Sequence, residues 1–164
     1  MRYHNITKDD MLNGFGLRVV LWVSGCEHRC GGCHNPITWN PDDGLLFDEA
    51  ARAEIFEELS RDYINGITLS GGDPLYIQNR ECIGGLISDI KEEFPEKTIW
   101  LYTGYIWENI NTLDFIPKID VIVDGKFIEE FKDNSIHWRG SSNQRVIDVK
   151  KTIKRSEVVL VREE

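Results

Sequence analysis

Six short segments of the chain are almost continuously apolar, and polar or glycine-bearing stretches separate them. These segments cover residues 17–23, 66–70, 98–102, 121–125, 145–149 and 157–161. The first four are rich in β-branched residues, which is typical of strands that are buried on both faces of a parallel sheet. The pattern therefore predicts a sheet of about five or six strands.

Two longer stretches between these strands show the periodicity of amphipathic helices. Residues 48–63 carry an apolar stripe that includes Ile55 and Leu59, and residues 79–94 form a second pattern that ends just before Pro95. Shorter helices are expected after positions 105 and 126. Strands that alternate with helices predict right-handed βαβ units, and the strands are too few for an eight-unit barrel. We expect an α/β fold built as an incomplete (βα) barrel.

The composition fits one domain over residues 1–164. The chain has 164 residues, of which 41% are hydrophobic, and no repeat or Pro/Ser-rich linker divides it. Nineteen basic against 28 acidic side chains give a net charge of −9, which disfavours nucleic acid and anionic membranes as partners. The apolar runs are far shorter than the roughly 20 residues of a membrane helix. We therefore expect a soluble protein.

Glycine and polar residues follow each of the first four predicted strands. The strand ends read "SGC", "SGGDP", "YTGY" and "DGK" in chain order. Ligands of open α/β sheets collect at the carboxyl ends of the strands, and glycine lets a backbone approach a ligand closely. The four ends together predict a ligand pocket at this edge of the sheet.

Three of the four cysteines lie close together in "GCEHRCGGCHNP", where Cys26, Cys30 and Cys33 follow the first predicted strand. This crowding argues against two disulfides, and the chain shows no leader pattern, so we expect thiolate ligands in a reducing, cytoplasmic setting. Cys82 lies in a helical pattern and is interpreted as a small apolar residue.

A closed metal site normally takes four protein ligands, and the cysteine motif supplies three. One interpretation is a structural zinc site with His28 or His34 as the fourth ligand. The other is a [4Fe–4S] cluster whose fourth iron is left open for a small molecule. The residues alone leave both interpretations open.

Five further stretches carry a resemblance to a known family. They read "CHNPITW", "LSGGDPL", "LYTGYIWE", "VDGKF" and "WRGSSNQRVIDV", in register between about residues 11 and 149. With the cysteine motif they resemble the radical S-adenosylmethionine superfamily. Within it they are similar to the glycyl-radical activases that serve the anaerobic ribonucleoside-triphosphate reductase.

The resemblance implies both the cofactors and the reaction. The open iron would be chelated by the amino and carboxylate groups of S-adenosylmethionine, and reductive cleavage would yield a 5′-deoxyadenosyl radical. That radical would remove hydrogen from a backbone glycine of the large reductase subunit. A flavodoxin-type protein would donate the electron. The cofactors would carry the radical, so no side chain is expected to act as a catalytic residue.

The resemblance also implies a set of cofactor-binding residues. Gly71 and Gly72 would offer backbone carbonyls to the α-ammonium, with Asp73 adding charge or fixing the loop. The superfamily commonly has Glu at the position of Asp73. Thr103 is expected to line the same pocket from the third strand, and Cys26, Cys30 and Cys33 are the expected cluster ligands.

Four more residues complete this set. Asp124 and Lys126 are expected near the carboxylate and ribose of the cofactor. His34 and Asn35 are candidates next to the third cysteine, where the activases often have an aromatic residue before that cysteine and this chain has Gly32. The 138–145 stretch, which contains Arg139 and Arg145, is expected either to close the pocket or to engage the partner protein. An activase of another glycyl-radical enzyme, a zinc-binding module and a small electron-transfer protein are the alternatives.

Overall fold

The computed structural model describes residues 1–162 and contains one seven-stranded sheet. Residues 163–164, the last two of the predicted domain, lie outside the described residues. The strand order is β3-β1-β2-β4-β5-β6-β7. The strands are β1 (Arg2–Asp10), β2 (Arg18–Val23), β3 (Leu45–Leu46), β4 (Gly66–Gly71), β5 (Thr98–Tyr102), β6 (Val121–Asp124) and β7 (Arg145–Asp148).

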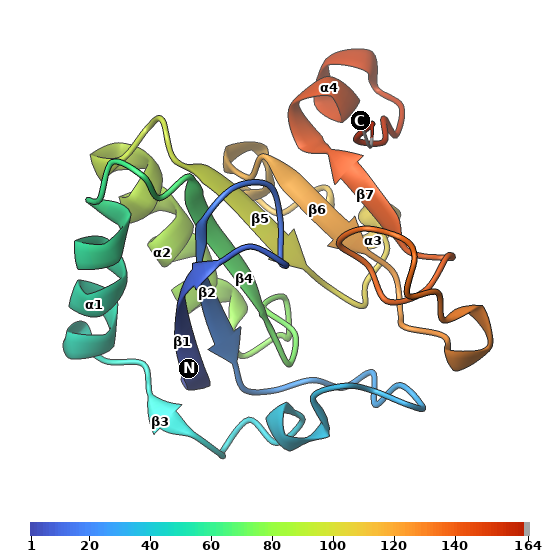
Figure 1. Cartoon of the computed structure of the whole chain (residues 1–164), viewed down its shortest axis with the longest axis horizontal. Helices are drawn as coiled ribbons and strands as arrows, with labels where there is room; N and C mark the ends of the chain where they lie inside the picture. The colour runs from blue at the N-terminus through green and yellow to red at the C-terminus, as the bar shows by residue number, and fades with distance from the viewer. Residues whose placement is uncertain (163–164) are drawn as a thin grey trace.

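The four central strands are parallel, as their continuous apolar character predicted. β2 pairs with β4, β4 with β5, and β5 with β6, all in parallel. β1, β3 and β7 add antiparallel strands at the two sides. Parallel strands place their carboxyl ends at one edge of a sheet. The segments after β2, β4 and β5 therefore meet at the lower edge in Figure 1.

Three details of the predicted sheet are wrong. The sheet has seven strands rather than five or six. β1 and β3 were not predicted, because β1 is mostly polar and β3 has only two residues. Residues 157–161 form no strand. Their contact with the sheet is one isolated bridge between Leu160 and Ile147 and a few backbone hydrogen bonds.

The predicted helices are present but shorter at their ends. α1 (Glu49–Leu59) begins where the Asp48 carboxylate accepts a hydrogen bond from the Ala51 amide, and α2 (Arg80–Glu93) ends before Pro95. The short α3 (Trp107–Ile110) follows Tyr105. A 3₁₀ turn (Glu129–Phe131) follows Lys126. α4 (Val149–Arg155) lies at the far end of β7 (Figure 1).

The two faces of the sheet are chemically different. Alternate strand residues such as Leu21, Leu69 and Leu101 pack with the helices in the main core. The opposite face carries Arg18, Thr68 and Trp100, and the loop between β1 and β2 crosses it in front of β4 and β5 (Figure 1). This second face also holds a small buried cluster of Trp100, Val123 and Val146.

Arg18 fixes the crossing loop to that face. It is fully buried, and its guanidinium donates hydrogen bonds to the Thr68 hydroxyl at 2.8 Å and to backbone carbonyls that include Phe15. Burial lowers the pKa of Arg18 to about 10. The Thr68 hydroxyl donates in turn to the Asn13 carbonyl at 2.6 Å. The loop is therefore held in place by buried polar contacts.

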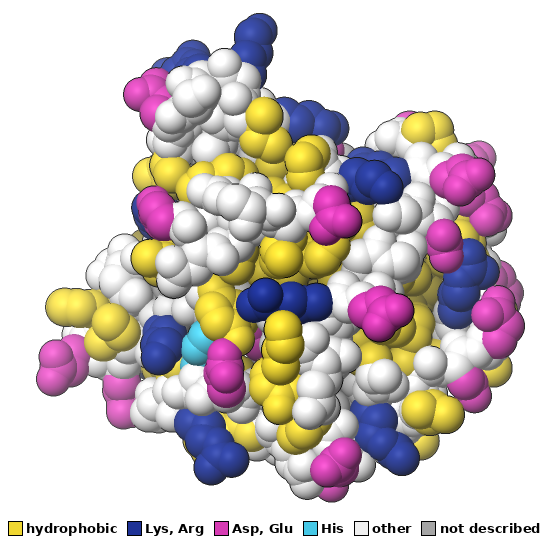
Figure 2. All heavy atoms as spheres, turned by 180° about the vertical axis from the view of Figure 1, so that it is seen from behind, with side chains coloured by type: hydrophobic (Ala, Val, Ile, Leu, Met, Phe, Trp, Pro, Cys, Tyr) yellow, Lys and Arg dark blue, Asp and Glu magenta, His cyan; other side chains and the backbone are white. Residues whose placement is uncertain are grey.

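On the surface opposite to the view of Figure 1, residues 1–162 form no continuous band of one charge. Figure 2 shows acidic and basic side chains interspersed with hydrophobic ones on that side. Within residues 1–162, no helix has the length and apolar character that crossing a membrane requires.

Candidate cofactor site

A cavity of about 580 Å³ lies at the carboxyl ends of the parallel strands. Its wall brings together eight of the eleven residues that were predicted to bind the cluster or the cofactor. They are Cys26, Cys30, Cys33, His34, Asn35, Gly71, Gly72 and Thr103. The loop after β2 supplies the first five, and the tips of β4 and β5 supply the others. The cavity is large enough for a cofactor of drug-like size.

All three loop cysteines are free thiols on this wall, and all three are half-buried. Burial raises the pKa of Cys26 to about 11. The Cys33 sulfur accepts a hydrogen bond from the Asn35 amide at 3.4 Å. Bound iron would reverse the effect of burial, because a cation stabilises the thiolate.

The loop cysteines are not arranged as a mononuclear metal site in this structure. Within the described part of the chain, no three His, Cys, Asp or Glu side chains converge as a mononuclear site requires. A cubane needs no such convergence, since each thiolate binds its own iron atom. His28, one of the two candidate zinc ligands, instead contacts Asp73.

The glycine pair after β4 lies in tight contact with the loop after β2. Gly71 has φ +104°, and a Cβ there would come within 2.5 Å of the Val23 amide nitrogen. A Cβ on Gly72 would come within 2.5 Å of the Gly25 carbonyl. Only glycine allows this approach. The pair therefore places bare backbone on the cavity wall beside the cysteines.

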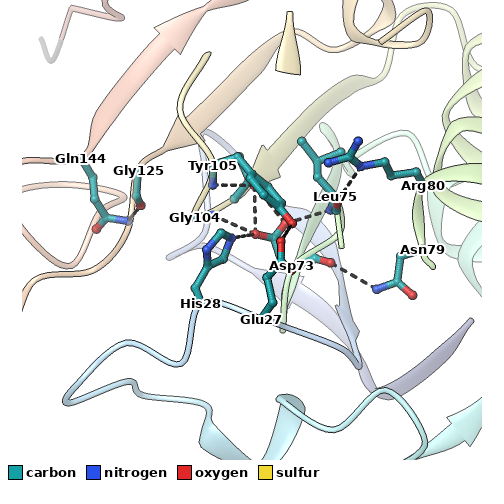
Figure 3. A network of polar contacts seen from close by, with 11 residues as sticks. Glu27, His28, Asp73, Leu75, Asn79, Arg80, Gly104, Tyr105, Gly125 and Gln144 are labelled. Carbon is teal, nitrogen blue, oxygen red and sulfur yellow. Dashed lines mark hydrogen bonds and ion pairs between the residues drawn. The ribbon is translucent and has the colours of Figure 1, made fainter. Parts of the chain in front are cut away.

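Asp73 is not among the residues that line the cavity, although it directly follows Gly72. Its side chain is 1% exposed. The carboxylate accepts hydrogen bonds from the Leu75 amide at 2.8 Å and from the Gly104 amide at 2.9 Å. The Thr103 hydroxyl also donates to it, at 2.9 Å. Of the two roles expected for Asp73, these contacts match fixing the loop (Figure 3).

Asp124 and Lys126 also fall outside the residues that line the cavity. Asp124 is buried, and its carboxylate accepts hydrogen bonds from the Trp107 amide and from Arg145, which also binds Glu108. Lys126 is exposed. Both residues were expected near the cofactor because they flank Gly125 in the "DGK" strand end. Of these three residues, only Gly125 lines the cavity.

The 138–145 stretch is largely a folded turn. The Gln144 side-chain oxygen accepts hydrogen bonds from the Gly140 and Ser141 amides, and its nitrogen donates to the Gly125 carbonyl (Figure 3). Ser141 is fully buried. Arg139 and Gln144 line the cavity, whereas Arg145 is paired with Asp124. The turn thus closes one side of the cavity.

Sequence reasoning missed several residues of the wall. Phe127 and Trp138 line it, as do Leu12 and Asn13 from the loop that crosses the sheet. The Phe127 ring lies 5.5 Å from the His34 ring. Phe127 follows the "DGK" strand end directly, so its position was a usable signal. Leu12 and Asn13 carry no such signal in the sequence, because their loop reaches the cavity only through contacts between residues that are distant in sequence.

The comparisons with known proteins agree with this site. Residues 12–147 match the model of the 4Fe-4S single cluster domain family. The matched span contains the cysteine loop and every other residue of the predicted site. A cluster is thereby favoured over zinc.

Curated relatives are similar over nearly the whole chain. The anaerobic ribonucleoside-triphosphate reductase-activating protein of Enterobacteria phage T4 is 50% identical over 146 residues, which cover 89% of this chain and 93% of the relative. Its counterpart in Escherichia coli K12 is 45% identical over 150 residues, covering 89% and 97%. That of Haemophilus influenzae is 43% identical over 148 residues, covering 88% and 96%.

Proposed function

The chain belongs to the family of anaerobic ribonucleoside-triphosphate reductase-activating proteins, and from this premise we propose that it generates the glycyl radical of that reductase by cleaving S-adenosylmethionine. It is an activating enzyme with a 4Fe-4S cluster domain. We assign it the incomplete-barrel architecture of the radical S-adenosylmethionine superfamily, for which the parallel strands β2, β4, β5 and β6 supply the support.

The three cysteines of the loop after β2 are the proposed cluster ligands. Cys26, Cys30 and Cys33 share one cavity wall, which supports a common role, and Cys82 lies in α2 and outside that wall. Three thiolates leave one iron of a cubane without a protein ligand. When bound by these cysteines, the cluster would supply the electron for reductive cleavage of S-adenosylmethionine, the chemistry from which the glycyl radical of the reductase would be made.

The chain's own residues bind and orient the nucleotide in this proposal. Gly71 and Gly72 present backbone beside the cysteines, where a carbonyl can accept from the α-ammonium. Thr103 lines the pocket from β5, and Asn35 lines it next to Cys33. His34 and Phe127 supply neighbouring rings for the adenine. The Asp73 carboxylate has no part in ligand binding here, because it already accepts four donors.

The proposal implies two protein partners and a compartment. The large catalytic subunit of the reductase is the macromolecular substrate, in keeping with the printed names of the relatives. A flavodoxin-type protein is the proposed electron donor. A cytoplasmic location is proposed because free thiols persist in reducing compartments.

The observation that carries this proposal is the meeting of three free thiols and a glycine pair on one cavity wall. The test begins with protein purified without oxygen, in which iron and sulfide are counted. After reduction with dithionite, S-adenosylmethionine is added and 5′-deoxyadenosine is measured. The large reductase subunit is then added, and electron paramagnetic resonance (EPR) spectra are recorded for a glycyl radical.

We expect about four irons per chain, 5′-deoxyadenosine formation, and a glycyl radical only when the reductase subunit is present. A colourless zinc protein that yields no 5′-deoxyadenosine would contradict the proposal. Formation of 5′-deoxyadenosine without a radical on the reductase would contradict the choice of partner.

A further inference from the structure

We propose that Asp73 and His28 form a tether that positions the cysteine loop, and that Asp73 is a positioning residue rather than a ligand of S-adenosylmethionine. The inference rests on the proposed function, since it concerns the loop that would hold the cluster. It assigns His28 a role other than metal ligation. Figure 3 shows the two side chains and the network around them.

The Asp73 carboxylate has no capacity left for a ligand. An ionised carboxylate offers about four lone-pair sites. Three are used by Leu75, Thr103 and Gly104, as described above. The fourth accepts from the His28 Nε2 at 2.8 Å. An ammonium group brought to this buried carboxylate would have to displace one of these donors.

His28 occupies a slot that is shaped for its ring. Its side chain is 6% exposed. The ring packs edge-on against Tyr105, with 4.5 Å between the ring centroids. A Cβ on Gly104 would collide with the imidazole. Gly104 therefore leaves the space that His28 fills, and its amide donates to the same Asp73 oxygen as the imidazole does.

A second anchor holds the neighbouring residue of the loop. The Tyr105 hydroxyl donates a hydrogen bond to the Glu27 carboxylate. The Arg80 guanidinium lies 5.4 Å from the centre of the Tyr105 ring and donates to the Leu75 carbonyl. Glu27 and His28 are thus both fixed to segments that follow β4 and β5.

These two anchors lie in one half of the cysteine loop. Glu27 and His28 lie between Cys26 and Cys30. In the other half, a Cβ on Gly31 would meet no atom within 4 Å, although Gly32 lies beside the Glu129 side chain. A held segment loses less conformational freedom when its cysteines bind iron. The tether therefore prepares Cys26 and Cys30 for the cluster and sets where the cluster lies relative to the glycine pair.

The first experiment compares His28→Leu with His28→Gln in the cluster-loaded protein. Glutamine can place a donor near the position of the imidazole Nε2, and leucine cannot. We measure the rate at which a chelator removes iron and the EPR spectrum of the reduced cluster. For His28→Leu we expect about tenfold faster iron loss, the factor that corresponds to losing a hydrogen bond to a charged group, and shifted g-values. His28→Gln should restore most of both.

The second experiment separates positioning from ligand binding at Asp73. Asp73→Glu restores the residue that the superfamily commonly has, and it retains the charge. A ligand role predicts that Asp73→Glu binds S-adenosylmethionine as tightly as the wild type does. The tether predicts faster iron loss, because the longer side chain does not fit a buried site surrounded by fixed donors. Asp73→Asn should also release iron faster, since one amide oxygen cannot serve all four donors.

A matched control and a combined variant complete the test. His137→Leu makes the same change at an exposed histidine outside the loop and should leave iron loss unchanged. Because the tether acts as one unit, the double variant His28→Leu/Asp73→Asn should lose iron no faster than the worse single variant. Additive effects would contradict a shared role.

One measurement needs no variant. An ionised carboxylate only accepts, so the tether requires a proton on the His28 Nε2. The ¹H–¹⁵N spectrum of the wild-type imidazoles should show that proton protected from exchange. Wild-type iron retention and g-values in His28→Leu, or an unprotected Nε2 proton, would overturn the tether while leaving radical formation intact. A wild-type protein without a cluster would instead overturn the proposed function.

Discussion

At the scale of single residues, the position of each cysteine explains its expected role. Cys26, Cys30 and Cys33 line one cavity, whereas Cys82 lies in α2, where burial raises the pKa of its thiol. Burial raises the pKa of Cys26 as well, so position on the cavity wall, and not the pKa, separates Cys82 from the other three. The four cysteines therefore divide into a set of three and one structural residue.

Alanine variants of the four cysteines test this division. Cys26→Ala, Cys30→Ala and Cys33→Ala should each abolish S-adenosylmethionine cleavage, because two thiolates hold a cluster poorly. Cys82→Ala should keep the iron content and cleavage of the wild type. Iron counting and 5′-deoxyadenosine assays report both quantities. A Cys82→Ala protein as inactive as the others would show that the ligand set is wrong.

Phe127 offers a second test at the residue scale. Its ring lies on the cavity wall beside His34, and an aromatic contact with a nucleobase contributes about 1–3 kcal/mol. Phe127→Ala should therefore weaken S-adenosylmethionine binding by about tenfold or more, with Phe127→Tyr as the conservative control. Calorimetric titration of the cluster-loaded protein measures the affinity. Equal affinity of wild type and Phe127→Ala would place the adenine elsewhere.

Residues in short motifs were predictable, and residues that meet across the fold were not. The cysteines were predictable from their spacing, and the glycine pair from its position after a predicted strand. The contact between His28 and Asp73 joins positions 45 apart, and the Arg145–Asp124 pair joins positions 21 apart. A single sequence carries no local pattern for such pairs, and the expectation for Asp124 rested on the family resemblance.

At the scale of elements, the pattern of apolar residues predicts the central strands of the sheet but not the strands at its edges. Most residues of β2, β4, β5 and β6 are buried, because both faces of these strands are covered. β1 reads as "RYHNITKDD" and gives no such signal, because most of its residues are only partly buried. Residues 157–161 read as a strand, yet they follow α4 and make only isolated bonds beside β7.

Arg145 joins β6, β7 and α3, which makes it a test of element packing. Its guanidinium binds the buried Asp124 carboxylate and the Glu108 carboxylate, and these bonds raise the pKa of Arg145 and lower that of Glu108. Arg145→Met leaves Asp124 buried without a cation, which should cost about 3 kcal/mol in unfolding free energy.

Because Arg145 and Asp124 are not on the cavity wall, Arg145→Met should leave S-adenosylmethionine affinity within about twofold of the wild type, a change of less than 0.5 kcal/mol. Denaturant unfolding and ligand titration measure the two quantities separately. A large loss of affinity with unchanged stability would show that Arg145 and Asp124 take part in cofactor binding.

Asp120 joins β5, α2 and α4 and predicts a dependence on pH. Its carboxylate accepts from the Ile99 amide at 2.8 Å, from Lys91 at 2.9 Å and from Lys150. Burial raises the pKa of Asp120, but the hydrogen bonds from Lys150 and Lys91 outweigh burial and leave that pKa below its usual range.

A lowered carboxyl pKa stabilises the fold above the unfolded value of about 3.9, and that stabilisation disappears as the pH falls through the folded value. Asp120→Asn should therefore lower the unfolding free energy by about 1–3 kcal/mol at pH 7. The gap to the wild type should shrink below about pH 4. Urea unfolding of both cluster-free proteins across this range measures the gap, and a gap that does not change with pH would contradict the assignment.

At the scale of the whole molecule, the two faces of the open sheet differ in what they contain. The helix-covered face carries the main core, and the opposite face, which holds Arg18 and Trp100, reaches the cavity wall at Trp22 and Tyr102. The net charge of −9 supplies no general attraction for anions. The carboxylate of a bound cofactor would therefore have to be met by local contacts, and the tips of β4, β5 and β6 all reach the cavity.

The central claim is that the polypeptide ligates three irons and leaves the fourth to S-adenosylmethionine. Electron–nuclear double resonance on the reduced cluster tests it directly, with S-adenosylmethionine that carries ¹⁷O in its carboxylate or ¹⁵N in its amino group. The account predicts a strong hyperfine coupling from each label, which disappears when the unlabelled compound is used. A fully loaded cluster that shows no coupling from either label, and whose fourth iron is bound by a side chain of the protein, would contradict it.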